Sequence, residues 1–204
     1  MGAKQYDRSY FDRWYRKSSM EIGHRSFVER KVRLAVAAAE YVLSRKVASV
    51  LDVGCGEAPW RALLKRMRPG IRYQGLDSSE YVVSRHGKRR DIALGSLTEL
   101  GFMGYEGPWD LVVCADVLHY VPARDARDGL KAIADRMQGV AFIEAFTNAD
   151  QIEGDHAEFQ NRTPAIYRKL FADAGLVPIG LHLYACREQF DELTVLEQGA
   201  ASRR

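Results

Sequence analysis

The chain has 204 residues, of which 47% are hydrophobic and 28% are charged, and its formal net charge is +3. This balance predicts one globular domain with a sizeable core and excludes a disordered or fibrous chain. The small positive charge does not by itself call for a nucleic-acid partner. The three cysteines, Cys55, Cys114 and Cys186, lack zinc-type spacing and are expected to be reduced, with no metal bound. No leader-like or membrane-spanning run is visible, so we expect a cytoplasmic protein.

The first predicted element is a helix over residues 4–19. Its aromatic residues recur at helical spacing and form a stripe, so the helix is expected to pack against something. The stripe includes Tyr6, Tyr10, Trp14 and Tyr15. A loop over 20–26 and an amphipathic helix over 27–45 follow.

Residues 47–67 are the stretch around which the chain is organised. The run from Val47 to Val53 is apolar apart from its polar Ser49 and Asp52, which suits a strand buried on both faces. Gly54 and Gly56 then make a turn that a ligand can approach closely, and a helix starts at Pro59. Such a unit is expected to present backbone N–H groups to a cofactor at the carboxyl edge of a parallel sheet.

The second predicted strand covers 71–76 and ends at Asp77. This acid lies 21 positions after Gly56, about where α/β folds hold a ribose, although Asp77 and the serines after it also suit a helix cap. A short helix over 79–84 leads into a basic run, 85–90. The run is interpreted as a solvated loop, with contact to RNA phosphates as the alternative. A third strand over 91–94 follows.

The remaining elements continue the alternation of strands and helices. A buried strand over 110–115 is followed by a turn that ends at Pro122 and then by a helix over 125–137. The later elements are a strand over 140–146, a long loop over 147–161, a helix from 164 to 174, and two strands over 177–184 and 190–197. A frayed tail, 198–204, ends the chain. These elements predict an α/β, doubly wound sheet of seven strands.

Two details distinguish between cofactors. Pro59 stands where the dinucleotide fingerprint G-x-G-x-x-G requires a small residue. Asp52 precedes the first glycine, and its carboxylate would face a pyrophosphate unfavourably. A ligand that carries positive charge is therefore the better fit.

The pattern Asp52-x-Gly54-x-Gly56 and the stretch 108–122 resemble two motifs of class I S-adenosylmethionine (SAM) methyltransferases, in the family's order and at its distance. The resemblance covers roughly residues 28–197. It implies a Rossmann-like sheet, mostly parallel, with an antiparallel strand in a C-terminal hairpin, and SAM as the cofactor. Ala58 replaces the third glycine, and Ser96 replaces the usual adenine-binding Asp. The implied cofactor-binding residues are Asp52, Gly54, Cys55, Gly56, Asp77, Ser78, Ser96, Leu97, Ala115 and Asp116.

The resemblance also implies methyl transfer to an acceptor. His119 and Glu144 are candidate catalytic bases, and the alternative for His119 is a helix residue that is hydrogen-bonded within the fold. The segment 1–27 is either a lid over the 28–197 domain or a simply packed helix, and Tyr6, Tyr10, Trp14, Tyr15, Tyr120 and His156 are the expected lid and substrate residues. No Asn-Pro-Pro-Tyr-like string follows the fourth strand, so a small-molecule acceptor with a reactive O or N atom is predicted, for a monomer or homodimer.

Two alternatives stay open. One is an NAD(P)-dependent oxidoreductase on a related sheet, against which Pro59 and Asp52 argue. The other is a SAM-binding interaction module that has lost catalysis. Asp52, Gly54, Gly56 and Asp77 are retained, and they predict cofactor binding without proving turnover.

Overall fold

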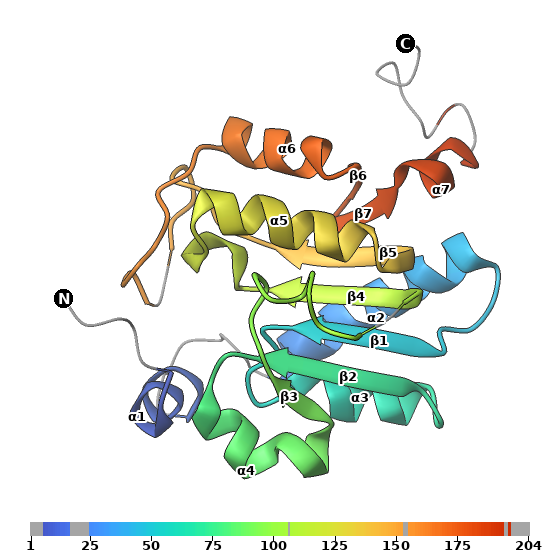
Figure 1. Cartoon of the computed structure of the whole chain (residues 1–204). Coiled ribbons are helices and arrows are strands. Elements are labelled where there is room, and N and C mark those ends of the chain that lie inside the picture. The colour runs from blue at the N-terminus through green and yellow to red at the C-terminus, as the bar shows by residue number, and fades with distance from the viewer. Residues whose placement is uncertain (1–5, 17–24, 106, 153–154, 194–195, 197–204) are drawn as a thin grey trace.

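The computed structural model describes residues 6–16, 25–105, 107–152, 155–193 and 196. It has a seven-stranded sheet with the order β3-β2-β1-β4-β5-β7-β6 (Figure 1). The strands are β1 (Ser49–Val53), β2 (Arg72–Asp77), β3 (Ile92–Leu94), β4 (Trp109–Ala115), β5 (Met137–Glu144), β6 (Leu176–Gly180) and β7 (Leu183–Cys186). The pairings from β3 to β5 are parallel, and β7 runs antiparallel to β5 and β6. The predicted fold class is confirmed.

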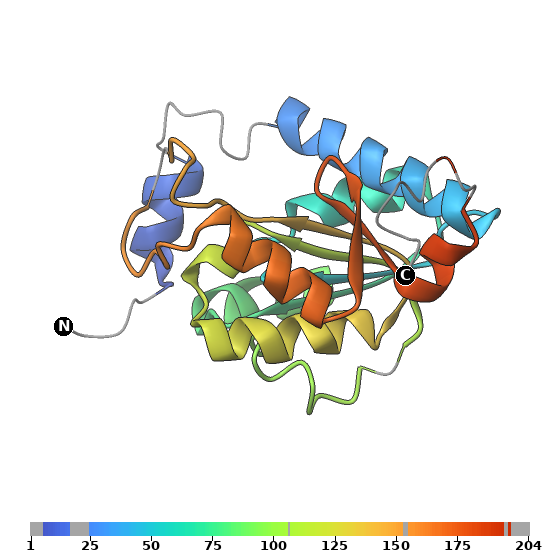
Figure 2. The ribbon, with the colours of Figure 1, turned by 90° about the horizontal axis from the view of Figure 1, so that it is seen from above.

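Helices cover both faces of the sheet, as Figure 2 shows. One face packs on α2 (Arg25–Leu43), α3 (Pro59–Met67) and α4 (Glu80–Arg90). The other packs on α5 (Ala123–Ala134) and α6 (Pro164–Asp173). Alternate residues of the central strands supply the two cores, which is the pattern expected of a sheet buried on both sides. None of the helices within the described residues has the length and apolarity needed to cross a membrane.

The strand order shows where a ligand would bind at the edge of the sheet. From β1 the chain moves to β2 and β3 on one side, whereas β5 lies beyond β4 on the other side. Between β1 and β4 the winding therefore reverses. Ligands of open α/β sheets bind outside the carboxyl ends of the strands at such a reversal.

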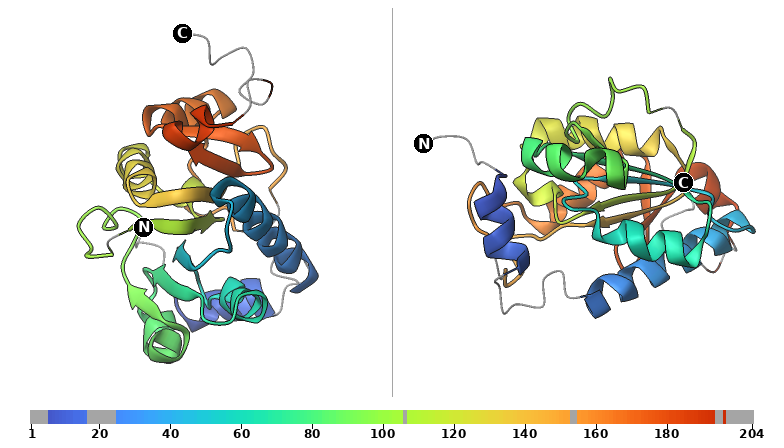
Figure 3. Two further views of the ribbon diagram at one scale, coloured as in Figure 1. Left: turned by 90° about the vertical axis from the view of Figure 1, so that its right-hand side faces the viewer. Right: turned by 90° about the horizontal axis from the view of Figure 1, so that it is seen from below.

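The N-terminal aromatic helix is shorter and less regular than predicted. It consists of α1 (Arg8–Phe11), capped by Asp7, and a π-helical turn η1 (Asp12–Arg16). Figures 1 and 3 show α1 at the end of the sheet where the strands point, apart from the body of α2.

The prediction of a solvated loop over the basic run 85–90 was wrong. The helix that begins after Ser79 continues to Arg90 because His86 and Gly87 are buried on its inner face. Asp91, at φ +55°, ends it in a left-handed conformation. The basic side chains at its end also interact favourably with the helix dipole.

The C-terminal strands were also predicted wrongly in position. The hairpin of β6 and β7 lies within residues 176–186, and α7 (Arg187–Asp191) occupies the start of the predicted last strand. The turn uses Leu181 and His182, both at positive φ, where Gly or Asn would have signalled a hairpin. The predicted tail, 198–204, lies outside the described residues.

Candidate active site

A cavity of about 400 Å³ opens at the carboxyl ends of β1, β4 and β5. Its walls come from the N-terminal segment, α2, the turn after β1, the turn after β4, and the loop that follows β5. The lining residues are Tyr10, Trp14, Phe27, Val28, Lys31, Asp52, Gly54, Cys55, Pro59, Trp60, Ala115, Asp116, His119, Tyr120, Glu144, Phe146, Gln151, Ile152 and Asp155. The volume is that of a site for a small molecule.

The glycine turn after β1 is held tightly against the turn after β4. Gly54 has φ +68°, and a Cβ atom there would lie 2.3 Å from a methyl carbon of Val117. The backbone N–H groups of Gly54 and Cys55 both donate to the Leu76 carbonyl, and that of Gly56 donates to Asp77. The turn therefore offers a close backbone surface. The expectation that it presents free N–H groups was wrong, because β2 already takes them.

Asp52 is a buried acid in the wall of the cavity. Its side chain accepts a 2.7 Å hydrogen bond from the Tyr73 hydroxyl of β2. Burial raises the pKa of Asp52 to about 7, and the negative charge of Asp77 acts in the same direction. Such a group changes its charge readily when a cation binds beside it.

Asp77 ends β2 on the same edge of the sheet as Asp52. Its carboxylate accepts hydrogen bonds from the N–H groups of Gly56 (2.6 Å) and Ser79 (2.9 Å). Burial raises its pKa. The Ser79 hydroxyl donates to the Tyr6 carbonyl at 2.5 Å, so the N-terminal segment is tied to the end of β2.

His119 lies in a short 3₁₀ turn, η2 (Leu118–Tyr120), and is only 1% exposed. Its Nε2 lies 3.3 Å from a carboxylate oxygen of Asp116, and its Nδ1 accepts a long 3.4 Å hydrogen bond from the Phe146 N–H. This assigns the ring proton of the neutral imidazole to Nε2. Asp116 itself stands at φ +66°, a strained conformation of the kind found at functional sites.

Glu144 ends β5 and is 6% exposed. Its carboxylate accepts a 2.5 Å hydrogen bond from the Lys31 ammonium of α2. The backbone carbonyl of Glu144 accepts the N–H of Asp116, so the ends of β4 and β5 are joined at the cavity.

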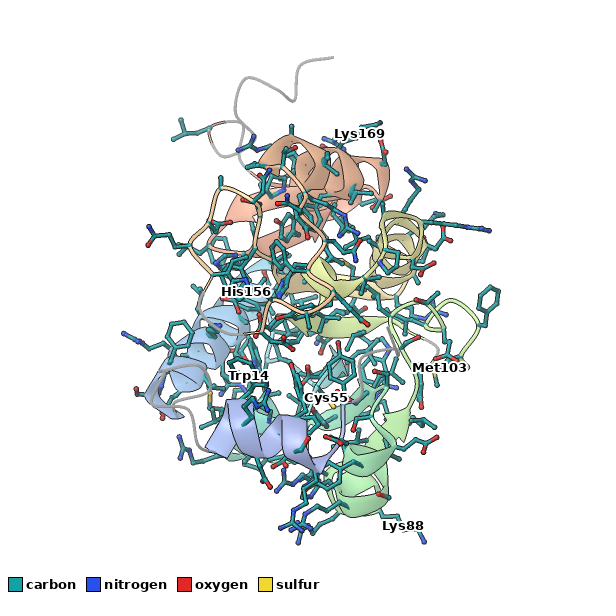
Figure 4. All side chains as sticks on the ribbon, turned by 90° about the vertical axis from the view of Figure 1, so that its left-hand side faces the viewer. Trp14, Cys55, Lys88, Met103, His156 and Lys169 are labelled. Carbon is teal, nitrogen blue, oxygen red and sulfur yellow. The ribbon has the colours of Figure 1, made fainter. Side chains whose placement is uncertain are left out.

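Aromatic residues close the outer part of the cavity. Tyr10 and Trp14 come from the N-terminal segment, and Tyr120 donates a 2.8 Å hydrogen bond to the Asp155 carbonyl. Figure 4 looks onto this face, with Trp14 and Cys55 near its middle and Lys88, Met103 and Lys169 at its periphery. Burial and nearby acids raise the pKa of Tyr6 to about 12, which keeps its hydroxyl neutral.

Several predicted site residues do not line the cavity, and Tyr6, Gly56 and Asp77 are among them. Ser78 and His156 are exposed, and Ser96 binds the Glu99 carboxylate through its N–H and its hydroxyl. Leu97 is buried in the core, packed where Gly129 leaves space for it. Tyr15 lies in η1, but its side chain is outside the described part of the chain.

The sequence interpretation missed Lys31, Phe27 and Tyr73. Lys31 and Phe27 read as parts of an ordinary amphipathic helix, and only the packing of α2 against β5 brings them to the cavity. For Tyr73 a signal existed. It stands two residues before Gly75, the register partner of Asp52, so both side chains share one face of the sheet.

A family model described as a methyltransferase domain matches residues 23–182. The match spans most of the chain, and the chain therefore belongs to this methyltransferase family. The predicted family and enzyme class are confirmed. No curated protein matches the chain.

Solved methyltransferases share the fold at low sequence identity. The magnesium protoporphyrin IX methyltransferase ChlM from Synechocystis PCC 6803, with bound S-adenosylhomocysteine (SAH), is 19% identical with a TM-score of 0.60, over 83% of each chain. The O-methyltransferase NcsB1 from neocarzinostatin biosynthesis, in complex with SAH and 1,4-dihydroxy-2-naphthoic acid, is 18% identical (TM-score 0.54, over 78% of this chain and 55% of that one). A candidate O-methyltransferase from Nostoc punctiforme PCC 73102 is 17% identical, with a TM-score of 0.51 over 80% of this chain and 56% of that one. The chain thus spans little more than half the length of NcsB1 and of the Nostoc protein. The prediction of SAM as the cofactor agrees with the SAH bound to ChlM and to NcsB1.

The residues of the cavity fit a sulfonium nucleoside. Gly54 and Cys55 line the cavity, and Val117 occupies the space that a side chain at Gly54 would need. Asp52 supplies a carboxylate suited to a cation, and Asp77 lies one strand away. Between the two acids, the side chains of Cys55 and Tyr73 pack over Gly75, the register partner of Asp52.

Proposed function

We propose that this protein is a SAM-dependent methyltransferase that acts on an oxygen or nitrogen atom of a small molecule. The observation that carries the proposal is Asp52, a buried carboxyl group in the wall of a cavity at the sheet reversal. When bound, the cofactor supplies an electrophilic methyl group on a sulfonium, whose sulfur keeps the electrons of the broken bond.

The residues that would hold the cofactor follow the edge of the sheet. Asp52, Gly54, Cys55 and Gly56 would face its charged end, and Asp77 would accept hydrogen bonds from the ribose hydroxyls. Asp77 already carries two backbone N–H donors, which leave lone pairs on its oxygens for a diol. Ser78, Ser96 and Leu97 stay proposed contacts for the nucleoside, although they lie outside the cavity wall.

Ala115 and Asp116 stay proposed cofactor contacts, and the η2 turn that follows them would position the acceptor. For an acceptor that must lose a proton, His119 is the proposed base: its Nδ1 accepts a long hydrogen bond from the Phe146 N–H, and Asp116 lies beside Nε2. Glu144 is the second candidate, and it is already paired with Lys31.

A small acceptor is supported by the size of the cavity, about 400 Å³. Tyr10 and Trp14 on one side and the loop after β5 on the other line the same cavity. We infer that this N-terminal segment acts as a lid that excludes water during transfer. The complex of NcsB1 with a dihydroxynaphthoic acid supports an aromatic hydroxyl as one class of acceptor to try first.

Calorimetry and a turnover assay test the proposal together. We expect heat with SAM and SAH and none with NADH, and SAH release with at least one phenol or amine of a small-molecule panel. Heat with NADH alone would establish the oxidoreductase alternative. Cofactor binding without SAH release on any acceptor, bulk RNA included, would favour a silent binding module.

A further inference from the structure

The cavity wall is rich in acids but has one basic side chain of the lysine or arginine type. Four carboxyl groups line it, those of Asp52, Asp116, Glu144 and Asp155. Among the described residues that line the cavity, Lys31 alone carries an ammonium or guanidinium group. An anionic group of any ligand in this cavity therefore has one charged partner.

Lys31 is held in the cavity wall by Glu144 and Phe27. Its ammonium donates to Glu144 at 2.5 Å and lies 4.2 Å from the centre of the Phe27 ring. The two side chains of the ion pair are 19% and 8% exposed. An ammonium has three N–H donors, and the contact with Glu144 uses one of them.

Stability alone is a weak reason for such a pair. Removing two charges from water costs about as much as their attraction returns, so apolar residues of similar size would serve the fold as well or better. A pair that faces a cavity instead offers a fixed ammonium whose position is set by its carboxylate. This is the arrangement suited to bind a ligand carboxylate without ordering a flexible lysine at the moment of binding.

We propose that Lys31 binds the α-carboxylate of the amino acid moiety of SAM and that Glu144 is the positioning residue that orients it. This inference rests on the proposed function and assigns a part of the cofactor that the glycine turn and Asp77 leave without a partner. Glu144 thereby acts through Lys31 and need not act as a base.

The sheet order supports this placement. Asp77 ends β2, Asp52 lies in β1, and Glu144 ends β5, with β4 between the last two. β2 and β5 are thus three strand spacings of about 4.8 Å apart. A nucleoside with an extended amino acid tail, bound to Asp77 by its ribose and to Lys31 by its carboxylate, crosses this distance over Asp52. Val28 and Trp60 also line the cavity and would cover the methylene groups of the tail.

Calorimetry with two ligands measures how much the α-carboxylate contributes to binding. SAH and its decarboxylated analogue share the adenosine, the sulfur and the amine, and differ only in the group that Lys31 would bind. In Lys31→Met we expect the affinity for SAH to fall about 10- to 100-fold, the effect of losing one hydrogen bond between charged groups. The affinity for the decarboxylated analogue should stay within about twofold of that of the native protein. Lys131→Met, which removes an exposed lysine paired with Asp135, is the matched control and should change neither affinity.

The double variant Lys31→Met/Glu144→Gln guards against misfolding, because it removes the buried charge that the single variant leaves unpaired. It should reproduce the selective loss of SAH binding with native thermal stability. Equal losses for both ligands in this variant, or a full affinity for SAH accompanied by a raised KM for an acidic acceptor, would overturn the assignment. If the native protein binds neither SAM nor SAH, the proposed function itself fails, which is a distinguishable result.

Discussion

The Tyr73 hydroxyl donates a 2.7 Å hydrogen bond to the Asp52 carboxyl group beneath the candidate cofactor site. The bond crosses from β2 to β1 because Gly75 has no side chain, and a Cβ there would lie 2.8 Å from the Cys55 sulfur and 3.3 Å from the Tyr73 ring. It favours the charged form of Asp52, whereas burial disfavours that form more strongly, and the pKa is about 7 in consequence. Asp52 is therefore poised to lose its proton when a cation arrives.

The first prediction concerns the pH dependence of SAM binding. Below pH 7 the carboxyl group of the free protein is protonated and must release a proton to face a cation. The association constant for SAM should therefore rise with pH, by up to about tenfold per unit, between pH 5.5 and 7. Titration calorimetry at several pH values measures it, and the window stops below the pKa of the ligand's own α-amino group, about 7.7–8.0. In Asp52→Asn the slope should vanish, and an unchanged slope would contradict the assignment to Asp52.

The second prediction concerns the stability of the protein without ligand. The folded pKa of Asp52 lies above its ordinary value of 3.8, so the folded state keeps a proton that the unfolded chain releases. The proton kept on Asp52 stabilises the folded state fully below pH 3.8, and this contribution to the free energy of unfolding is lost as pH rises toward 7. Asp52→Asn removes this loss and should be more stable than the native protein at pH 8, by about 2 kcal/mol, or about 4–8 °C in Tm.

Thermal unfolding at pH 5 and pH 8 provides the control for this second prediction. The advantage of the variant should grow with pH. Asp110, whose pKa is lowered from 3.8 by Arg45 and other hydrogen bonds despite burial, contributes stability that stays complete at pH 5 and pH 8. It does so in both proteins, so the difference between them isolates Asp52. A variant less stable than the native protein at pH 8 would contradict the prediction.

The third prediction tests the close approach in the glycine turn. In Gly54→Ala the new methyl group meets Val117 at 2.3 Å, and the substitution should lower stability and abolish detectable SAH binding. Adding Val117→Ala removes the nearest atoms and should restore stability apart from the cost of φ +68°, about 1 kcal/mol. SAH binding should stay weak in the double variant if the ligand occupies the surface of Gly54. Gly104→Ala, at a position with open space, is the matched control, and full SAH binding by the double variant would show that the ligand lies elsewhere.

Much of the fold followed from local patterns. The strands β1 and β4 are nearly continuous apolar runs, and the Gly-x-Gly turn with Pro59 marks the start of α3, so the centre of the sheet was predictable. The continuation of α4 through its basic end depended on the burial of His86 and Gly87 against the sheet, which composition does not encode. The β6–β7 hairpin has positive φ at Gly180, Leu181 and His182, and the two central positions carry neither glycine nor asparagine, so the usual signal of a two-residue hairpin turn is missing.

The site residues that belong to a sequence motif at the end of one strand were predictable. Asp52 and Gly54 belong to a motif, and the cavity contains both. Lys31 and Arg162 reach their places only through tertiary packing, because each lies on an element whose own pattern indicates an ordinary surface helix or loop. Long-range contacts of this kind leave no periodic trace in one sequence.

The last prediction concerns Arg162, which is 5% exposed and ends the loop after β5. Its guanidinium donates to the carbonyl groups of Leu118, at 3.0 Å, and Val121, which flank the η2 turn that carries His119. Arg162→Met removes the guanidinium donors from both carbonyls, although the Leu118 carbonyl still accepts the Val121 N–H, so the turn should loosen while the turn at Gly54 keeps its geometry. We expect amide hydrogen exchange to accelerate over 117–121 and over 147–152, methyl transfer to fall at least tenfold in kcat, and SAH affinity to change by less than about threefold.

Two further variants are the controls for Arg162→Met. Tyr167→Phe removes another partner of the guanidinium without touching the η2 turn and should leave amide exchange in that turn unchanged. Arg162→Lys should recover part of the activity. A uniform loss of protection across the sheet in Arg162→Met would instead show that this arginine stabilises the whole fold, since only a local effect is consistent with positioning of His119.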